Sequence, residues 1–309
     1  MTGRLGAVGS HPARRARQFL LVLVPVVLMT LPVGAWAAFT AATDNAGDVW
    51  GAASSYRAGG DLYASGDGKA GQTGAIDLSG YLAPQLVGSV TTWSTVSAGA
   101  FHTCAVRTGG TLWCWGDNSS GRLGLGDITD RSSPVQVGTV TTWSTVSASS
   151  SHTCAVRTDA TLWCWGNNGS GRLGLGDTTE RTSPVQVGTA TTWSTVSAGS
   201  SHTCAVRTDA TLWCWGFNGS GRLGLGDTSS RTSPVQVGTA TTWSTVSAGR
   251  YHTCAVRTDA TLWCWGNNGT GQLGLGDTVD RTSPTSVAVP GGIVTHLGQM
   301  RGSTTLAIA

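Results

Sequence analysis

The stretch His152-Thr-Cys-Ala-Val-Arg-Thr-Asp-Ala-Thr-Leu-Trp-Cys-Trp-Gly166 recurs along the chain at a spacing of fifty residues. Residues 134–183 and 184–233 are identical at 45 of 50 positions. A sequence that repeats itself so closely builds one supersecondary unit several times and stacks the copies. The repetition also argues against an enzyme, because a catalytic site needs different residues in unique roles.

Each unit is composed of short runs rich in Val, Thr, Trp and Cys, which are separated by Ser/Gly or Asp-Ala breaks. These runs are typical of β-strands, and Asp159-Ala160 is typical of a hairpin turn. No stretch shows the 3.6-residue apolar period of an amphipathic helix. A Gly-rich segment, 167–177, follows the hairpin, and Pro184 suits the start of an edge strand. Four short strands in about fifty residues are typical of a propeller blade.

Residues 152–177 closely resemble the repeat of the regulator-of-chromosome-condensation (RCC1) family. The resemblance implies a β-propeller, usually of seven blades, and its founding member's activity is guanine-nucleotide exchange. This chain departs from that pattern, since it has only four full repeats. They span residues 84–133, 134–183, 184–233 and 234–283.

Poorer copies flank the full repeats. Residues 61–74 align with 111–124, and 304–309 resemble 252–257. We therefore expect a degenerate unit at 38–83 and a half unit at 284–309. Residues 45–51 look like the second half of a hairpin and could close the ring against the half unit, which would remove exposed strand edges. The prediction is an all-β propeller of five or six four-stranded blades, four of them complete.

The N-terminal segment carries arginines, then an apolar run from Phe19 to Val33 and small residues. This pattern predicts a signal peptide at 1–37, with cleavage between Ala37 and Ala38. The alternative is an uncleaved membrane anchor, and either places the repeats outside the cytoplasm. Without the four leader arginines, 15 basic residues face 16 acidic ones. No nucleic-acid partner is therefore expected.

Eight cysteines form four pairs, each ten residues apart across a hairpin turn. An even count in an exported chain predicts disulfides. A three-residue turn would place the two cysteines opposite each other, whereas a two-residue turn would put them on opposite faces. A metal site at His152, Cys154 and Cys164 is the alternative, although it lacks C-x-x-C spacing. The predicted bonds join Cys104 to Cys114, Cys154 to Cys164, Cys204 to Cys214 and Cys254 to Cys264.

Other motifs favour structural roles. Gly169-Ser-Gly-Arg-Leu-Gly174 matches G-x-G-x-x-G, but no βαβ unit surrounds it, so its glycines should serve turns and packing between blades. Asparagines in N-x-[ST] sequons are explained by turns. Histidines that follow the Ser/Gly loops should donate or accept structural hydrogen bonds. The sequon residues are Asn118, Asn168, Asn218 and Asn268, and the histidines are His102, His152, His202 and His252.

Nearly all differences among the full repeats fall on one side of the predicted propeller, which we call the upper face. A shared scaffold with differing residues on one rim is how repeat proteins build a binding face. The candidate binding residues are Phe101, Phe217, Arg250 and Tyr251. We expect a secreted or cell-surface, monomeric, non-enzymatic protein without a cofactor or metal, which binds a protein or a glycan. The alternatives are a guanine-nucleotide exchange factor and a secreted enzyme inhibitor.

Overall fold

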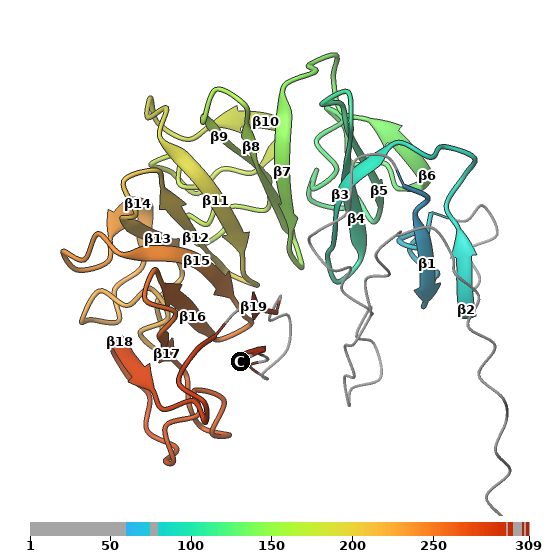
Figure 1. Ribbon diagram of the computed structural model, residues 1–309. Coiled ribbons are helices and arrows are strands. Elements are labelled where there is room, and N and C mark those ends of the chain that lie inside the picture. The colour runs from blue at the N-terminus through green and yellow to red at the C-terminus, as the bar shows by residue number, and fades with distance from the viewer. Residues whose placement is uncertain (1–59, 75–79, 295, 299–304, 306, 309) are drawn as a thin grey trace, which may run out of the picture. The chain divides into compact units, whose positions relative to one another are not determined.

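The computed structural model describes residues 60–74, 80–294, 296–298, 305 and 307–308. The regular elements among these residues are all β-strands (Figure 1), which confirms the predicted all-β fold. The predicted signal segment 1–37, its Ala37-Ala38 cleavage site and the strand expected at 45–51 lie outside the described residues. Within the described part of the chain, no helix is long and apolar enough to cross a membrane.

Each full repeat forms one four-stranded antiparallel sheet in which sequential strands are neighbours, and we name these sheets blades A to D in chain order (Figure 1). Blade A contains β3 (Trp93–Ala98), β4 (His102–Arg107), β5 (Leu112–Gly116) and β6 (Arg131–Gln136). Blade B contains β7 (Trp143–Ala148), β8 (His152–Arg157), β9 (Leu162–Gly166) and β10 (Arg181–Gln186). Blade C contains β11 (Trp193–Ala198), β12 (His202–Arg207), β13 (Leu212–Gly216) and β14 (Arg231–Gln236). Blade D contains β15 (Trp243–Ala248), β16 (His252–Arg257), β17 (Leu262–Gly266) and β18 (Arg281–Val287). The four predicted complete blades are thus confirmed.

A two-stranded sheet precedes blade A. It pairs β1 (Tyr63–Gly66) with β2 (Tyr81–Leu86). The carbonyl of Gln72 accepts hydrogen bonds from the Thr103 hydroxyl and the Trp115 indole of blade A, at 2.8 and 3.0 Å. The carbonyl of Arg122 accepts the same two bonds from blade B. The strands β1 and β2 therefore stand where the third and fourth strands of a blade would stand.

A second two-stranded sheet follows blade D and pairs β19 (His296–Leu297) with β20 (Ala307–Ile308). Next to β20, the Thr305 hydroxyl donates to the carbonyl of Gln272 at 2.7 Å. This bond repeats the one from Thr253 to the carbonyl of Arg222, at 2.8 Å. Thr305 therefore occupies the position of a second strand, as its resemblance to residue 253 predicts.

The hairpin turn of each full repeat has three residues. In blade B, the register pairs Val156 with Leu162, and the backbone N–H of Arg157 donates to the carbonyl of Thr161 at 3.0 Å. Ala160 completes the turn in the left-handed region, with φ at 57°. A three-residue loop of this kind needs one left-handed residue, and Gly110 supplies it in blade A with φ at 72°. The three-residue alternative is the correct one.

Neighbouring blades pack through apolar side chains from the third strand and later segments of one blade and from the first and third strands of the next. Leu112, Leu123 and Val137 of blade A lie against Trp143 and Trp165 of blade B, and all five are buried. The same contacts recur between blades B and C and between blades C and D. Each large buried ring stabilises the fold by about 2–3 kcal/mol. Inter-blade packing of tryptophan therefore forms much of the core.

The half-buried tryptophan of each third strand contacts an arginine near the hairpin turn. In blade B, the Arg157 guanidinium carbon lies 3.8 Å from the centroid of the Trp163 ring and 4.5 Å from that of Trp143. Cation–π contacts of this kind contribute about 0.5–1 kcal/mol where they are partly exposed. The arginine that ends each second strand thereby covers the indoles near the hairpin turn.

Candidate functional site

All complete blades share the same two ends. The loop after the first strand and the Gly-rich segment after the third strand lie at one end, which is the upper face predicted above. Hairpin turns such as 158–160 lie at the other end, the lower face. The two upper segments of blade B are joined, because the backbone N–H of Asn167 donates to the carbonyl of Ser151 at 2.9 Å.

Arginines of the Gly-rich segments connect the upper loops of neighbouring blades. Nη1 of Arg122 donates to the carbonyl of Ser150 in the next blade at 2.8 Å. Arg172 makes the same bond to Ser200 at 2.9 Å, and Arg222 makes it to Arg250 at 3.0 Å. The backbone of each contacted upper loop is therefore held by the preceding blade.

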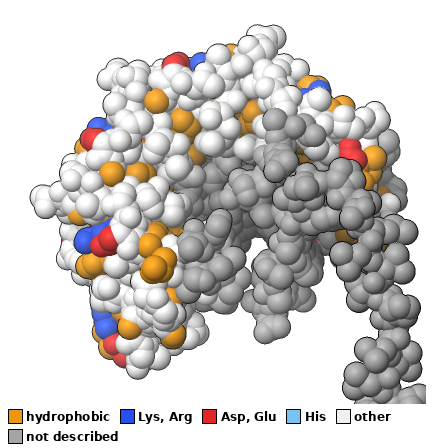
Figure 2. Space-filling view, in the orientation of Figure 1, with side chains coloured by type: hydrophobic (Ala, Val, Ile, Leu, Met, Phe, Trp, Pro, Cys, Tyr) orange, Lys and Arg blue, Asp and Glu red, His pale blue; other side chains and the backbone are white. Residues whose placement is uncertain are grey.

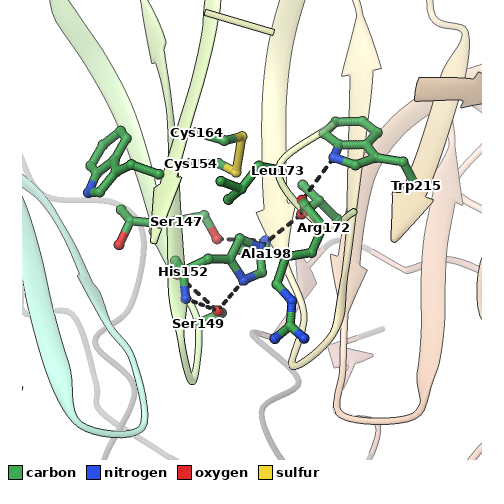
Figure 3. Close-up of a disulfide and its surroundings, with 12 residues drawn as sticks. Ser147, Ser149, His152, Cys154, Cys164, Arg172, Leu173, Ala198 and Trp215 are labelled. Atoms are coloured by element: carbon green, nitrogen blue, oxygen red, sulfur yellow. Dashed lines mark hydrogen bonds between the residues drawn. A yellow bond between two sulfur atoms is a disulfide. The ribbon is translucent and has the colours of Figure 1, made fainter. Parts of the chain in front are cut away.

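The repeated histidines hold blades together, as Figure 3 illustrates for blade B. Nε2 of His152 lies 2.8 Å from the hydroxyl of Thr203 in blade C. That hydroxyl donates its proton to the carbonyl of Arg172 at 2.8 Å, so Nε2 must be the donor. Nδ1 of the same ring contacts the Ser149 hydroxyl at 2.7 Å.

This environment keeps the histidine ring neutral. Burial, together with the nearby positive charge of Arg172, holds the pKa of His152 well below its usual value. Burial likewise lowers the pKa of His252 to about 4. All four repeated histidines are buried. The predicted structural role is confirmed for the bonds from His102, His152, His202 and His252 to a threonine of the following unit.

The sequon asparagines are buried turn residues. Oδ1 of Asn168 accepts the backbone N–H of Leu173 at 3.0 Å, and its Nδ2 donates to the carbonyl of Asp177 at 3.0 Å. The same bonds recur at Asn118, Asn218 and Asn268. An amide nitrogen that is buried and bonded in this way does not accept a glycan in the folded protein, so the turn explanation is correct.

Two glycines of the G-x-G-x-x-G motif serve close packing between blades. Gly171 and Gly174 have φ values of 73° and 75°. A Cβ atom on Gly171 would lie 2.7 Å from the Cα of Thr232, and one on Gly174 would lie 2.7 Å from Nε1 of Trp215. Only glycine combines this backbone conformation with so close an approach. The motif therefore packs blade B against blade C.

The four predicted cysteine pairs are present as disulfides, with sulfur–sulfur distances from 2.07 to 2.15 Å. In blade B, Cys154 lies directly opposite Cys164 on adjacent strands, at a Cα–Cα distance of 4.1 Å, and both residues are buried (Figure 3). Because these sulfurs are bonded to each other, they are not thiolate ligands, and the metal alternative at His152, Cys154 and Cys164 is wrong. The other three bonds have the same Cα–Cα distance and join Cys104 to Cys114, Cys204 to Cys214, and Cys254 to Cys264.

Three of the four predicted binding residues gather at the upper face of blades C and D. Phe217 and Tyr251 are 41% and 38% exposed. The guanidinium carbon of Arg222 lies 4.9 Å from the Phe217 ring centroid and 5.4 Å from the Tyr251 ring centroid. Arg250 is exposed, and its guanidinium carbon lies 5.0 Å from the Tyr251 ring centroid. We call these four residues the C–D cluster.

Phe101 is not part of this cluster. It is 49% exposed in the upper loop of blade A, where its carbonyl accepts the backbone N–H of Asp117 at 2.8 Å. Its role in binding stays a prediction, as does that of Phe217, Arg250 and Tyr251. Differences among the repeats did not point to Arg222, which lies between the two rings. The signal available was that Arg222 keeps the repeated arginine while position 217 changes to an aromatic residue.

A shallow groove runs over the upper loops of the blades. Small residues and backbone line it: Ala100, Ser149, Ser150, Ala198, Gly199, Ser200, Ala248 and Gly249. The backbone N–H of Ala100 donates to the carbonyl of Ser149 across it, at 3.1 Å. The groove has little depth for a small ligand, so the side chains that project beside it offer the distinctive contacts.

Five ion pairs join charged side chains within the described blades. Each Gly-rich segment closes with an ion pair such as Arg181–Asp177, at 2.6 Å. Figure 2 shows blue and red side chains next to each other near the rim of the displayed face. Ion pairs of this type are worth about 0–1 kcal/mol each, and they leave little net charge for long-range attraction of a ligand.

The repeated four-stranded sheets, joined by hydrogen bonds between upper loops and between second strands, define the protein as a β-propeller built from repeats. The Regulator of chromosome condensation (RCC1) repeat matches residues 109–156, 159–206, 209–256 and 259–297. A second form of that repeat matches residues 93–122, 143–172, 193–222 and 243–272. Because these matches cover more than half of the chain, the chain belongs to the RCC1 repeat family. No curated protein matches it.

Three similar solved structures share this fold. Human WBSCR16 has a TM-score of 0.71 at 21% identity, over 81% of this chain and 66% of that one. Prp20p of Saccharomyces cerevisiae has a TM-score of 0.68 at 19% identity, over 80% of this chain and 64% of that one. Yeast RCC1 (Prp20) bound to Kap60 has a TM-score of 0.69 at 18% identity, over 88% of this chain and 68% of that one. The chain thus spans about two thirds of the length of these structures, and the likeness concerns the fold.

Proposed function

We propose that this chain is an exported, non-enzymatic propeller that binds another protein through its upper face. The observation that carries the proposal is the C–D cluster, in which two exposed aromatic rings and an exposed arginine project from loops that neighbouring blades hold in place. Aromatic residues and arginine are enriched at binding hot spots. A pre-organised backbone lowers the entropy that binding costs.

Export is supported by the cysteines. Four buried disulfides, one in each complete blade, suit an oxidising compartment, and the leader pattern at 1–37 directs a chain there. The absence of catalysis is supported by the roles of the repeated polar residues. The repeated histidines, asparagines and arginines that could perform chemistry are used in bonds between or within blades.

The test uses the protein secreted by cells that express the full chain. A variant with Phe101, Phe217, Arg250 and Tyr251 replaced by Ala removes the upper-face side chains. The matched control replaces the four exposed threonines of the lower turns, Thr108, Thr158, Thr208 and Thr258, by Ala. We expect proteins captured from the secreted fraction to be retained by the wild type and the control, and lost by the upper-face variant at unchanged melting temperature.

Three outcomes would contradict the proposal. The first is equal capture by all three proteins, which would exclude the upper face. The second is capture that enzymatic deglycosylation of the partner abolishes, which would make the ligand a glycan. Binding of small molecules alone would also argue against a protein partner.

A second candidate is guanine-nucleotide exchange, which the family resemblance implies and which the likeness to Prp20p favours. Prp20p has binding properties toward Gsp1p and histones. Release of a fluorescent guanine nucleotide from Gsp1p, with and without this chain, tests that candidate directly. Faster release would support exchange activity, and an unchanged rate would exclude that activity toward Gsp1p.

A further inference from the structure

The C–D cluster holds two guanidinium groups with little opposing charge. Arg250 is exposed and makes no ion pair among the described residues. Arg222 lies beneath Phe217 and Tyr251, where Nη1 donates to the carbonyl of Arg250. The two cations are therefore linked through the backbone of one loop, and both border the same pair of rings.

In blade A, the charge of the equivalent arginine is neutralised by carboxylates of the same blade. Arg122 forms an ion pair with Asp117 at 3.1 Å, and while burial lowers the pKa of Arg122, Asp117 and Asp130 oppose that effect. Blade C has no carboxylate at either of the equivalent positions. Phe217 and Ser230 stand one hundred residues after Asp117 and Asp130. The Ser230 hydroxyl accepts the backbone N–H of Asn218, as the Asp130 carboxylate accepts that of residue 118.

One carboxylate remains near the cluster. Burial lowers the pKa of Arg222, while Tyr251 and then Asp280 of blade D oppose that effect. The Asp280 carboxylate already accepts the backbone N–H of Asn268 at 2.7 Å and contacts the side-chain amide of Asn267 at 3.2 Å. Among the described residues, Asp280 thus opposes the charge of Arg222 while it has other partners, and Arg250 has no ion pair, so the cluster has an excess of positive charge.

We infer that the C–D cluster binds a protein segment in which an acidic side chain is flanked by apolar side chains. This inference rests on the proposed function and names the chemistry of its partner. The carboxylate would accept hydrogen bonds from Arg250, whose planar fork matches a carboxylate with two parallel bonds. The apolar neighbours would cover the exposed parts of Phe217 and Tyr251.

Carboxylates along the upper face argue against a uniformly charged polyanion as the ligand. Asp117 lies on the upper face of blade A, Glu180 follows the Gly-rich segment of blade B, and Asp280 does so in blade D. A nucleic acid carries a charge at every phosphate and would meet these carboxylates along the face. A segment with one or two carboxylates among apolar residues avoids that repulsion and uses both rings.

The experiment measures fluorescence anisotropy with labelled twelve-residue peptides. The acidic peptide has Leu-Glu-Leu-Glu-Leu at its centre, and the neutral peptide has Gln at both Glu positions. We expect the acidic peptide to bind at least about tenfold more tightly, which corresponds to one charge-assisted hydrogen bond. Arg250→Ala should weaken binding of the acidic peptide about tenfold and leave binding of the neutral peptide almost unchanged. Phe217→Ala should weaken the binding of both.

Lys69→Ala is the matched control. Lys69 is exposed and stands fifty residues before Ser119, in the same upper segment of the preceding unit. Its removal takes one positive charge from the upper face without touching the C–D cluster, and should leave the affinity for the acidic peptide unchanged. An equal loss in Lys69→Ala and Arg250→Ala would reduce the effect to net charge and overturn the inference.

Two further outcomes would overturn it. The acidic and neutral peptides could bind equally, or a twelve-nucleotide single-stranded DNA could bind more tightly than the acidic peptide. The capture experiment described above tests the proposed function separately from this inference. If the upper-face variant loses its captured proteins but no acidic peptide binds to the wild type, the inference fails while the proposed function stands. If neither capture nor peptide binding occurs, both fail.

Discussion

Breaking the disulfide of blade C should lower the free energy of unfolding by an amount that can be worked out from its loop. Cys204 and Cys214 are ten residues apart, and their bond reduces the number of conformations that the unfolded chain can adopt. The loop-closure relation gives about 2.7 kcal/mol for a loop of that size. For a protein of this length, that loss corresponds to a fall in melting temperature of about 4–5 °C.

The two single variants and the double variant together separate the bond from the packing of the sulfurs. Cys204→Ala and Cys214→Ala each break the same bond, so each should cost nearly the full amount. The double variant should cost little more than either single variant, since the bond can be lost only once. Urea unfolding without reductant, followed by circular dichroism and with monomers confirmed by light scattering, measures all three values.

An additive result would refute this reasoning. If each single variant cost less than about 1 kcal/mol and the two costs summed in the double variant, the cysteines would act as separate buried side chains. A peptide map under non-reducing conditions should also show Cys204 linked to Cys214. A link from Cys204 to a cysteine of another blade would contradict the register in which these two residues lie opposite each other.

Other predictions follow from the bonds between and within blades. The pKa of His252 is lowered to about 4 from an ordinary value of 6.5, so the unfolded chain binds the proton more readily. The contribution of His252 to stability should be full above pH 6.5 and should fall by about 3 kcal/mol as the pH drops from 6.5 to 4, and the other buried histidines should add to that fall. Urea unfolding of the wild type and of His252→Gln at several pH values would measure this contribution. Asn218→Ala leaves the buried N–H of Leu223 without its acceptor and should cost about 2–3 kcal/mol in the same assay, whereas Asn218→Asp, which keeps an acceptor, should cost less. Gly171→Ala places a Cβ 2.7 Å from the Cα of Thr232. Its free energy of unfolding should be at least about 2 kcal/mol lower than that of Gly188→Ala, because Gly188 also has a positive φ but a Cβ there meets no atom within 4 Å. Equal melting temperatures of the two variants would show that the contact with Thr232 relaxes freely.

Repetition made the fold predictable, because each strand and turn occurs four times with the same neighbours. The register of the hairpin could not be settled in the same way. Asp159-Ala160 suits a two-residue turn, whereas the hydrogen bond from Arg157 to Thr161 and the left-handed conformation of Ala160 show that Thr158 belongs to the turn as well. Alanine rarely adopts that conformation, so its identity pointed away from the answer, while Gly110 at the same place in blade A pointed toward it.

The candidate site was predictable in part. Differences among the copies identified Phe217, Arg250 and Tyr251, because a binding surface varies where the scaffold does not. Arg222 could not be identified in this way, because it repeats the arginines at 122 and 172 and therefore resembles a scaffold residue. Its surroundings differ only through residues at other positions and in the next blade, and a comparison of copies position by position does not reveal which side chains meet in space.

In the upper loops, backbone groups join the blades and side chains face solvent, which explains how one face of such a repeat protein could acquire a ligand. The repeated arginines hold the upper loops by carbonyl groups, and every residue type has a carbonyl. Arg122 therefore holds Ser150, and Arg222 holds Arg250, at nearly the same distance. Side chains at these loops are free to change without loss of the bonds that join the blades. A change at position 217 from a carboxylate or amide to an aromatic ring keeps the scaffold intact and alters only what the upper face presents. Selection could thus act on the C–D cluster almost independently of stability, and the sharpest evidence for that view would be binding variants at 217, 250 and 251 whose melting temperatures equal that of the wild type.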